Sequence, residues 1–363
     1  DRSLVVYLPP GYRDRVLAGT GREARYVLLE PVRQYAADRM RGSEDREAVQ
    51  NRHCDFFLEW AEGIRSKLWG SEQALWFSRL EIEHENLRAA LEWCRSQGDV
   101  ETELRLVVAL SRFWDTHGHV REGRAYLDAA VARMTPALPH PLRVAALLPA
   151  GWMAGLQGDY SAARGYYEQV LAISREHYDP VIIARALNLL AAALVQESDY
   201  TAARALFEES LALYRELGWS GHAVLNNLGL LALRQADYEV ARDYLERSVA
   251  ACEVEGDRQM HGIVLWNLSV TDLNQARYED ARAHCVAALR LLHECGAVVN
   301  IPPVLDQMAL VVQAQAGWGR AARLLGAAEG LREAAGLPPD ATTERAAARA
   351  AAERVLGADA FAA

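Results

Sequence analysis

The stretch Ser198-Asp199-Tyr200-Thr201-Ala202-Ala203 recurs with small changes through the second half of the chain. Near-copies of it begin at Gly158, Ala236 and Ala276. An aromatic or imidazole side chain occupies the corresponding position in each of six repeats. These marker residues are His119, Tyr160, Tyr200, Tyr238, Tyr278 and Trp318. The intervals between them are 41, 40, 38, 40 and 40 residues. A fixed period of this length predicts an all-α solenoid of stacked helical hairpins.

Each repeat is expected to place one helix (helix A) before the Asp-Tyr turn and a second (helix B) after it. In the repeat around Tyr238, the pattern predicts helix A over about 222–235 and helix B over about 238–252. The third residue after the marker is alanine in five repeats, where it lets the two helices approach closely: Ala163, Ala203, Ala241, Ala281 and Ala321. Glu122 departs from this rule in the first repeat.

The chain outside the repeats divides into further segments. Two β-prone runs, 3–8 and 26–29, flank a long polar loop and predict a hairpin, followed by a helix over about 31–40. The segment 44–97 has a helical pattern, and an alanine-rich helix over about 343–356 could cap the array. We therefore expect a hairpin segment at 1–41, a helical connector at 42–100, an array of about six hairpins at 101–336 and a capping helix at 337–363.

Composition excludes several classes of function. The chain has 363 residues, a formal charge of −10 and a pI of about 5.6, which argues against nucleic-acid binding through a broad basic surface. Its five cysteines include no CxxC pair, so free thiols in a reducing cytoplasm are expected. No apolar run is long enough to predict a membrane span. Because the first residue is Asp1 and not methionine, we expect a piece of a longer protein.

The run Asn227-Leu228-Gly229, followed by Tyr238 and Ala241, resembles the tetratricopeptide repeat. This resemblance implies a right-handed superhelical solenoid. Three further phrases resemble segments of STAND/LuxR-type transcriptional regulators of actinobacteria: Arg25-Tyr26-Val27-Leu28-Leu29-Glu30-Pro31, Glu83-His84-Glu85-Asn86-Leu87-Arg88-Ala89-Ala90-Leu91 and Leu324-Leu325-Gly326-Ala327-Ala328-Glu329-Gly330-Leu331-Arg332. The resemblance implies that residues 1–41 are the end of a winged-helix segment and that an ATPase and a DNA-binding domain lie elsewhere in the parent protein.

Catalytic motifs are absent from the sequence. There is no GxxxxGK(S/T) phosphate loop, HExxH, GxSxG or EF-hand pattern, so neither an enzyme nor a bound cofactor is expected. His117-Gly118-His119 and the group His284, Cys285, His293 and Cys295 have ligand types that suit zinc. However, Cys285 holds the inward place that Leu245 and Phe207 hold in other repeats, which favours a core role and no metal.

The resemblance also indicates which helix A residues line the concave groove of the solenoid. They are Trp152, Arg185, Asn188, Gln196, Asn226, Arg234, Trp266, Asn274 and Asp306, with Trp114 and Ala314 at related places. Amides, guanidinium groups and indole rings suit a peptide, a sugar or a small metabolite. Asn188, Asn226, Trp266 and Asp306 share one repeat position and are expected to form a ladder. The alternative is that the polar side chains are merely solvated and the tryptophans are packing residues.

Polar residues elsewhere receive a simpler interpretation. Arg204, Glu208 and Glu209 are expected to be solvated on the outer face of a helix B. Arg13, Arg15, Arg22 and Arg25 could form a DNA-contacting wing, although the corresponding domain of STAND proteins usually transmits the nucleotide state.

These observations favour the effector-sensing and protein-interaction region of a bacterial transcriptional regulator. An unidentified small-molecule or peptide inducer, or a partner protein, would bind the groove and bias a relay to the ATPase and DNA-binding module outside this chain. The repeat array itself is expected to bind neither nucleic acid nor membrane. The alternative is a passive scaffold, or a homo-oligomerisation module, without a small ligand.

Overall fold

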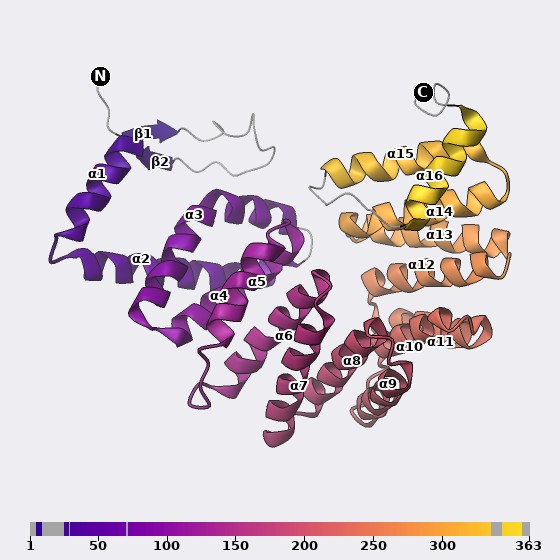
Figure 1. The fold of residues 1–363 in the computed structure, drawn as a ribbon, viewed down its shortest axis with the longest axis horizontal. Coiled ribbons are helices and arrows are strands. Elements are labelled where there is room, and N and C mark those ends of the chain that lie inside the picture. Colours follow the sequence, from indigo (N-terminus) through magenta and orange to yellow (C-terminus); the bar gives the residue numbers. More distant parts are fainter. Residues whose placement is uncertain (1–4, 9–24, 29, 70–71, 335–342, 358–363) are drawn as a thin grey trace. The chain divides into compact units, whose positions relative to one another are not determined.

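The structure, a computed structural model, describes residues 5–8, 25–28, 30–69, 72–334 and 343–357 (Figure 1). The chain forms two compact units, residues 1–150 and 151–363. The division falls inside a helix, and the segment bounds that the sequence pattern suggested stay predictions. None of the helices in the described part of the chain is long and apolar enough to cross a membrane.

Unit 1 begins with a pair of antiparallel strands. Strand β1 (Val5–Leu8) pairs with β2 (Arg25–Leu28), so that Val5 lies opposite Leu28. Helix α1 (Glu30–Arg41) follows, with Pro31 in its first turn, where no intrahelical N–H is needed. The connecting loop with Arg13, Arg15 and Arg22 lies outside the described residues, and the winged-helix assignment stays a prediction.

The rest of unit 1 is helical. Its elements are α2 (Arg46–Ile64), a 3₁₀ turn (Arg65–Leu68), α3 (Gln73–Gln97), α4 (Val100–Thr116), α5 (Val120–Val131) and the start of α6 (His140–Leu156). Helix α4 packs against α2 and α3, and Arg105 on α4 donates hydrogen bonds of 2.9 and 2.7 Å to Glu62 on α2. The first repeat is therefore packed into the connector, which explains why the compact unit extends past residue 100.

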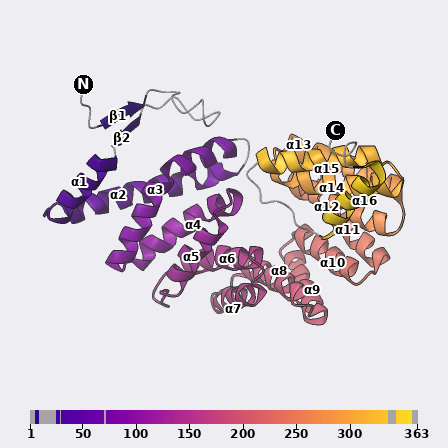
Figure 2. The ribbon, with the colours of Figure 1, turned by 45° about the horizontal axis from the view of Figure 1, so that its top comes forward.

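Unit 2 is a stack of antiparallel helical hairpins, which Figures 1 and 2 show succeeding one another along the chain. After the end of α6 its helices are α7 (Tyr160–Glu176), α8 (Pro180–Gln196), α9 (Tyr200–Glu216), α10 (His222–Arg234), α11 (Tyr238–Glu255), α12 (Arg258–Asn274), α13 (Tyr278–Glu294), α14 (Ile301–Ala314), α15 (Trp318–Ala334) and α16 (Thr343–Leu356). Consecutive helices make the main contacts, as expected for a solenoid. Helix α16 packs on α14 and α15, where Gln313 Nε2 donates to the Ala348 carbonyl at 3.1 Å.

The repeated phrase forms the turn between helix A and helix B. Asp159, Asp199 and Asp237 each cap the following helix by accepting a hydrogen bond from a backbone N–H three residues later, at 3.2, 3.1 and 3.4 Å. The residue before the capping position ends helix A in the left-handed conformation, with φ of 77° at Gly158 and 58° at Ala236. Arg277 replaces the aspartate in a later repeat and makes no capping bond.

The small residues of the repeat permit close helix packing. Ala203, Ala241 and Ala281 are all fully buried. A Cβ added at Gly229 on α10 would lie 2.7 Å from Leu245 Cγ on α11, so only glycine allows this approach. Four residues beyond each alanine of the repeat, the chain places a core side chain: Tyr167, Phe207, Leu245, Cys285 and Leu325. The predicted core position of Cys285 is confirmed.

The left-handed alanines give a testable prediction. Ala236→Gly should raise the free energy of unfolding of unit 2 by about 0.5–1 kcal/mol, because glycine lacks the Cβ that makes this conformation costly. Chemical denaturation followed by circular dichroism measures this change. Ala202→Gly, in the first turn of α9, is the matched control and should destabilise instead; a loss of stability in both variants would contradict the assignment.

Candidate functional site

The A helices of unit 2 carry the residues that the sequence indicated for a groove. Trp152 on α6, Arg185 and Gln196 on α8, Arg234 on α10 and Asn274 on α12 are exposed. Trp152 has 49% of its surface accessible, which is unusual for so large an apolar side chain. These five residues therefore offer exposed aromatic, amide and guanidinium groups on four successive A helices.

Asparagine side chains link successive A helices. Asn227 Nδ2 on α10 donates to Asn188 Oδ1 on α8 at 3.0 Å, and Asn267 Nδ2 on α12 donates to Asn226 Oδ1 at 2.8 Å. Asn226 and Asn227 are themselves joined at 3.4 Å. We call these four residues the asparagine ladder. Asn226 and Asn267 are only 4% and 6% exposed, so the ladder ties the repeats together below the surface.

The ladder differs from the predicted one in two members. Asp306 on α14 is 8% exposed and forms an ion pair with Arg332 on α15, which is 4% exposed. Trp266 is half-buried and packs against the core cluster that includes Leu265 and Met308. Asn226, Trp266 and Asp306 therefore stabilise the array, and the sequence pattern did not separate such buried helix A positions from exposed ones.

Some of the exposed residues predicted for the groove also make hydrogen bonds within the array. Arg234 Nη2 donates to Gln196 Oε1 at 3.2 Å, which links α10 to α8. Asn274 Nδ2 donates to the Val270 carbonyl of its own helix at 2.8 Å. Burial raises the pKa of the Tyr167 and Tyr214 phenols, and the positive charge of nearby Arg185 partly opposes this rise. Trp152 on α6 and Arg185 on α8 are both exposed.

A second set of contacts joins each helix B to the next helix A. The arginine four residues after the marker tyrosine reaches the end of the following A helix: Arg164 bonds Glu197 at 2.6 Å, Arg204 bonds Gln235 at 2.8 Å and Arg242 bonds Gln275 at 2.7 Å. Arg204 was expected to be merely solvated, so its repeat-to-repeat bond is a correction. Glu209, from the same group, accepts a bond from Arg175 at 3.0 Å, while Glu208 is exposed.

The corresponding arginine of the next repeat, Arg282, lines a surface pocket of about 1120 Å³. Trp318, Arg320 and Arg323 from α15 and Met308 from α14 also line it. The sequence pattern did not predict this pocket, because Arg282 shares its repeat position with Arg204 and Arg242, which bond to neighbouring helices. The clustering of Arg320 and Arg323 after Trp318 was the available signal.

Comparison with protein families identifies the repeats. Residues 150–180 and 182–253 match two tetratricopeptide-repeat family models. The chain therefore contains tetratricopeptide repeats, as Asn227-Leu228-Gly229 and the Tyr238 turn indicated.

The curated relatives are mycobacterial. The chain is 31% identical over 171 residues to "Putative HTH-type transcriptional regulator Rv0890c" of Mycobacterium tuberculosis and to "Putative HTH-type transcriptional regulator Mb0914c" of Mycobacterium bovis. The match covers 45% of this chain and 19% of each relative. The chain thus spans about a fifth of the length of these proteins.

Solved structures of similar fold are helical repeat proteins. A STAND protein with a tetratricopeptide-repeat sensor from Pyrococcus horikoshii superposes with a TM-score of 0.51 at 13% identity, over 92% of this chain and 53% of that one. A tetratricopeptide-repeat protein from Parabacteroides merdae gives 0.53 at 14% identity, over 78% and 96%. A Rap protein in complex with competence and sporulation factor gives 0.53 at 13% identity, over 84% and 92%. At these identities the likeness shows the fold alone.

Proposed function

We propose that this chain is the sensing and protein-interaction region of a bacterial transcriptional regulator, and that the exposed helix A face of unit 2 binds the inducer or partner. The observation that carries the proposal is the exposed indole of Trp152 on α6, followed by exposed Arg185 on α8. Leu156, one turn later on the same face of α6, is also 49% exposed, and a fully solvated role does not account for this exposed apolar surface. A ligand with an apolar or planar group and a carboxylate, such as a peptide segment, suits this pair.

Two comparisons support the proposal. The curated relatives carry names of transcriptional regulators, and one structure of similar fold is named as a STAND protein with a tetratricopeptide-repeat sensor. We infer that ligand binding biases the curvature of the array and that this bias passes to an ATPase and a DNA-binding module outside the described residues. Within this chain we assign a binding role and no catalytic step. A regulator in this role acts in the cytoplasm, because the bacterial promoter that it controls lies there.

The competing function is a scaffold that binds a second copy of the chain or another protein without a small ligand. The Arg282 pocket favours it, because an arginine-rich surface on α13 to α15 suits an acidic protein segment. Size-exclusion chromatography with light scattering distinguishes the two functions. A stable oligomer that Arg320→Glu dissociates and Arg185→Ala leaves intact would favour the scaffold.

Native mass spectrometry of the protein purified from its native host tests the sensing role. The wild-type protein is expected to carry a bound molecule, and Arg185→Ala and Trp152→Ala should each reduce its occupancy at least about tenfold, the loss typical of a truncated hot-spot residue. Glu208→Ala on α9 is the matched control, since Glu208 is exposed on a helix B. Equal occupancy in Arg185→Ala and Glu208→Ala, or an unoccupied wild-type protein, would contradict the groove assignment.

A further inference from the structure

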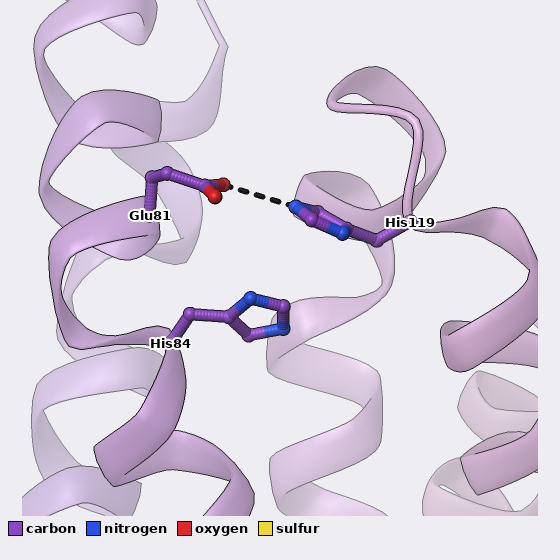
Figure 3. A group of neighbouring side chains, drawn as sticks. All are labelled: Glu81, His84 and His119. Atoms are coloured by element: carbon purple, nitrogen blue, oxygen red, sulfur yellow. Dashed lines mark hydrogen bonds and ion pairs between the residues drawn. The ribbon is translucent and has the colours of Figure 1, made fainter.

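A cluster of metal-ligating side chains lies in unit 1 and shares no residue with the proposed binding face of unit 2. Glu81 and His84 lie three residues apart on α3, and His119 is the residue just before α5. One ligand atom from each lies within 4.8 Å of the other two. Figure 3 shows the carboxylate and the two rings converging on one point. His119 Nε2 and Glu81 Oε2 are hydrogen-bonded at 3.0 Å, slightly closer than the about 3.3 Å between two ligands that each lie about 2.0 Å from one tetrahedral ion.

A second layer of residues orients His84. Its Nε2 lies 3.1 Å from Glu122 Oε1, which leaves Nδ1 for the side of the ring that faces Glu81 and His119 (Figure 3). Arg88 in turn holds Glu122, with Nε donating to Oε1 at 2.6 Å and a second bond from Nη2 to Oε2. A carboxylate that fixes the second nitrogen of an imidazole is the usual support of a metal-ligating histidine.

The surroundings of the cluster differ between its two sides. Phe113 is fully buried, and its ring centroid lies 5.3 Å from that of His84 and 5.2 Å from that of His119. The Glu81 side chain, by contrast, is 41% exposed. An ion held here would thus rest against an apolar floor and keep a coordination position open to water or to an incoming ligand.

We propose that Glu81, His84 and His119 form a binding site for a divalent transition metal, with Zn²⁺ as the best fit. Two imidazoles and one carboxylate are a ligand set that zinc accepts with an open fourth position, and they are poor ligands for Mg²⁺ or Ca²⁺. Glu122 is the second-layer carboxylate, neutralised by Arg88. The ion would join α3 to the start of α5. Sequence analysis singled out His119 beside His117, but His117 packs between Phe77 and Phe113 and takes no part.

Metal titration of the chelator-treated full chain tests the site, with Zn²⁺ alone in calorimetry and Co²⁺ alone in visible spectroscopy. One ion per chain is expected, with Co²⁺ bands of low coordination number and no thiolate charge-transfer band, because the ligands are nitrogen and oxygen. Glu122→Gln should weaken Zn²⁺ binding by the about 10- to 100-fold typical of second-layer changes, and Glu81→Gln and His119→Gln should each weaken it by more than about 100-fold.

His177→Gln is the matched control, because His177 is exposed at the end of α7 in unit 2. It should bind Zn²⁺ as the wild type does. Circular dichroism confirms that each variant is folded; Glu81 is exposed, so Glu81→Gln still tests the site if His119→Gln does not fold. Absence of saturable binding, equal affinity in Glu81→Gln and His177→Gln, or a thiolate band that assigns the ion to a cysteine would each overturn the proposal.

Discussion

Asp272→Ala is expected to lower the free energy of unfolding of unit 2 by about 3–5 kcal/mol, the cost of breaking a buried ion pair by removing one partner. Asp272 is fully buried at the end of α12. It accepts a hydrogen bond from His284 Nδ1 at 2.7 Å and forms an ion pair with Arg242, whose side chain is only 11% exposed. Without the carboxylate, the guanidinium stays buried with too few partners.

The same carboxylate makes stability depend on pH. Burial acts to raise the pKa of Asp272, but the hydrogen bonds from His284 and Arg242 outweigh it and hold the pKa below its ordinary value. A carboxyl whose pKa is lower in the folded than in the unfolded state stabilises the fold above the unfolded pKa, about 3.9. This contribution is lost as the pH falls from there through the folded pKa.

Urea denaturation at neutral pH, followed by circular dichroism, measures the effect of Asp272→Ala. Asp243→Ala is the matched control, because Asp243 forms an exposed pair with Arg247 on α11 at 2.9 Å and should cost no more than about 0.5 kcal/mol. If the two variants lost the same stability, the Asp272 network would not have the buried, paired character described above. Below the folded pKa of Asp272, the difference between the variant and the wild type should shrink.

Phe207→Ala is expected to cost a similar amount, about 3–5 kcal/mol, because it leaves a cavity in a core that cannot fully collapse. Phe207 is 1% exposed and packs in one cluster with Ala191, Leu211, Val224 and Leu228 from α8 to α10. Hydrogen exchange should show the largest loss of protection in α8 to α10, since repeats contact only their neighbours. Tyr178→Ala, at an 88% exposed position, is the control and should change little. A uniform loss along all of unit 2 would contradict local coupling.

The order of the helices follows from sequence because it depends on local signals. The Asp-Tyr turn recurs at nearly fixed intervals, and its aspartate caps the next helix wherever it is present. Period and capping therefore placed helix B at Tyr238, and the alanine-rich pattern placed the last helix at 343–356, as the structure shows. The extent of unit 1 was harder to predict, because Glu62 and Arg105 pair across 43 residues without any local signal.

The candidate sites depend on which residue of one helix faces which residue of the next, and on partners far away in the sequence. A repeat pattern gives neither. Position in the repeat predicted Asn188 and Asn226 together, but the amide that bonds Asn188 belongs to Asn227, one residue later on the helix. Likewise, nothing in the sequence around Asp306 shows that Arg332 will neutralise it. Glu81, His84 and His119 come from two segments, and only packing of α3 beside the start of α5 brings them together.

The asparagine ladder has a direction. Asn267 donates to Asn226, Asn226 to its neighbour Asn227 and Asn227 to Asn188, so both bonds between helices are donated toward the preceding helix A. An amide that donates becomes a better acceptor, and bonds aligned in this way polarise and strengthen one another. Loss of a central member such as Asn226 should thus weaken more than its own two bonds. The hydrogen bonds of the ladder join uncharged groups. Salt therefore does not screen their alignment from α12 to α8, whereas it does screen the arginine contacts on the other helices.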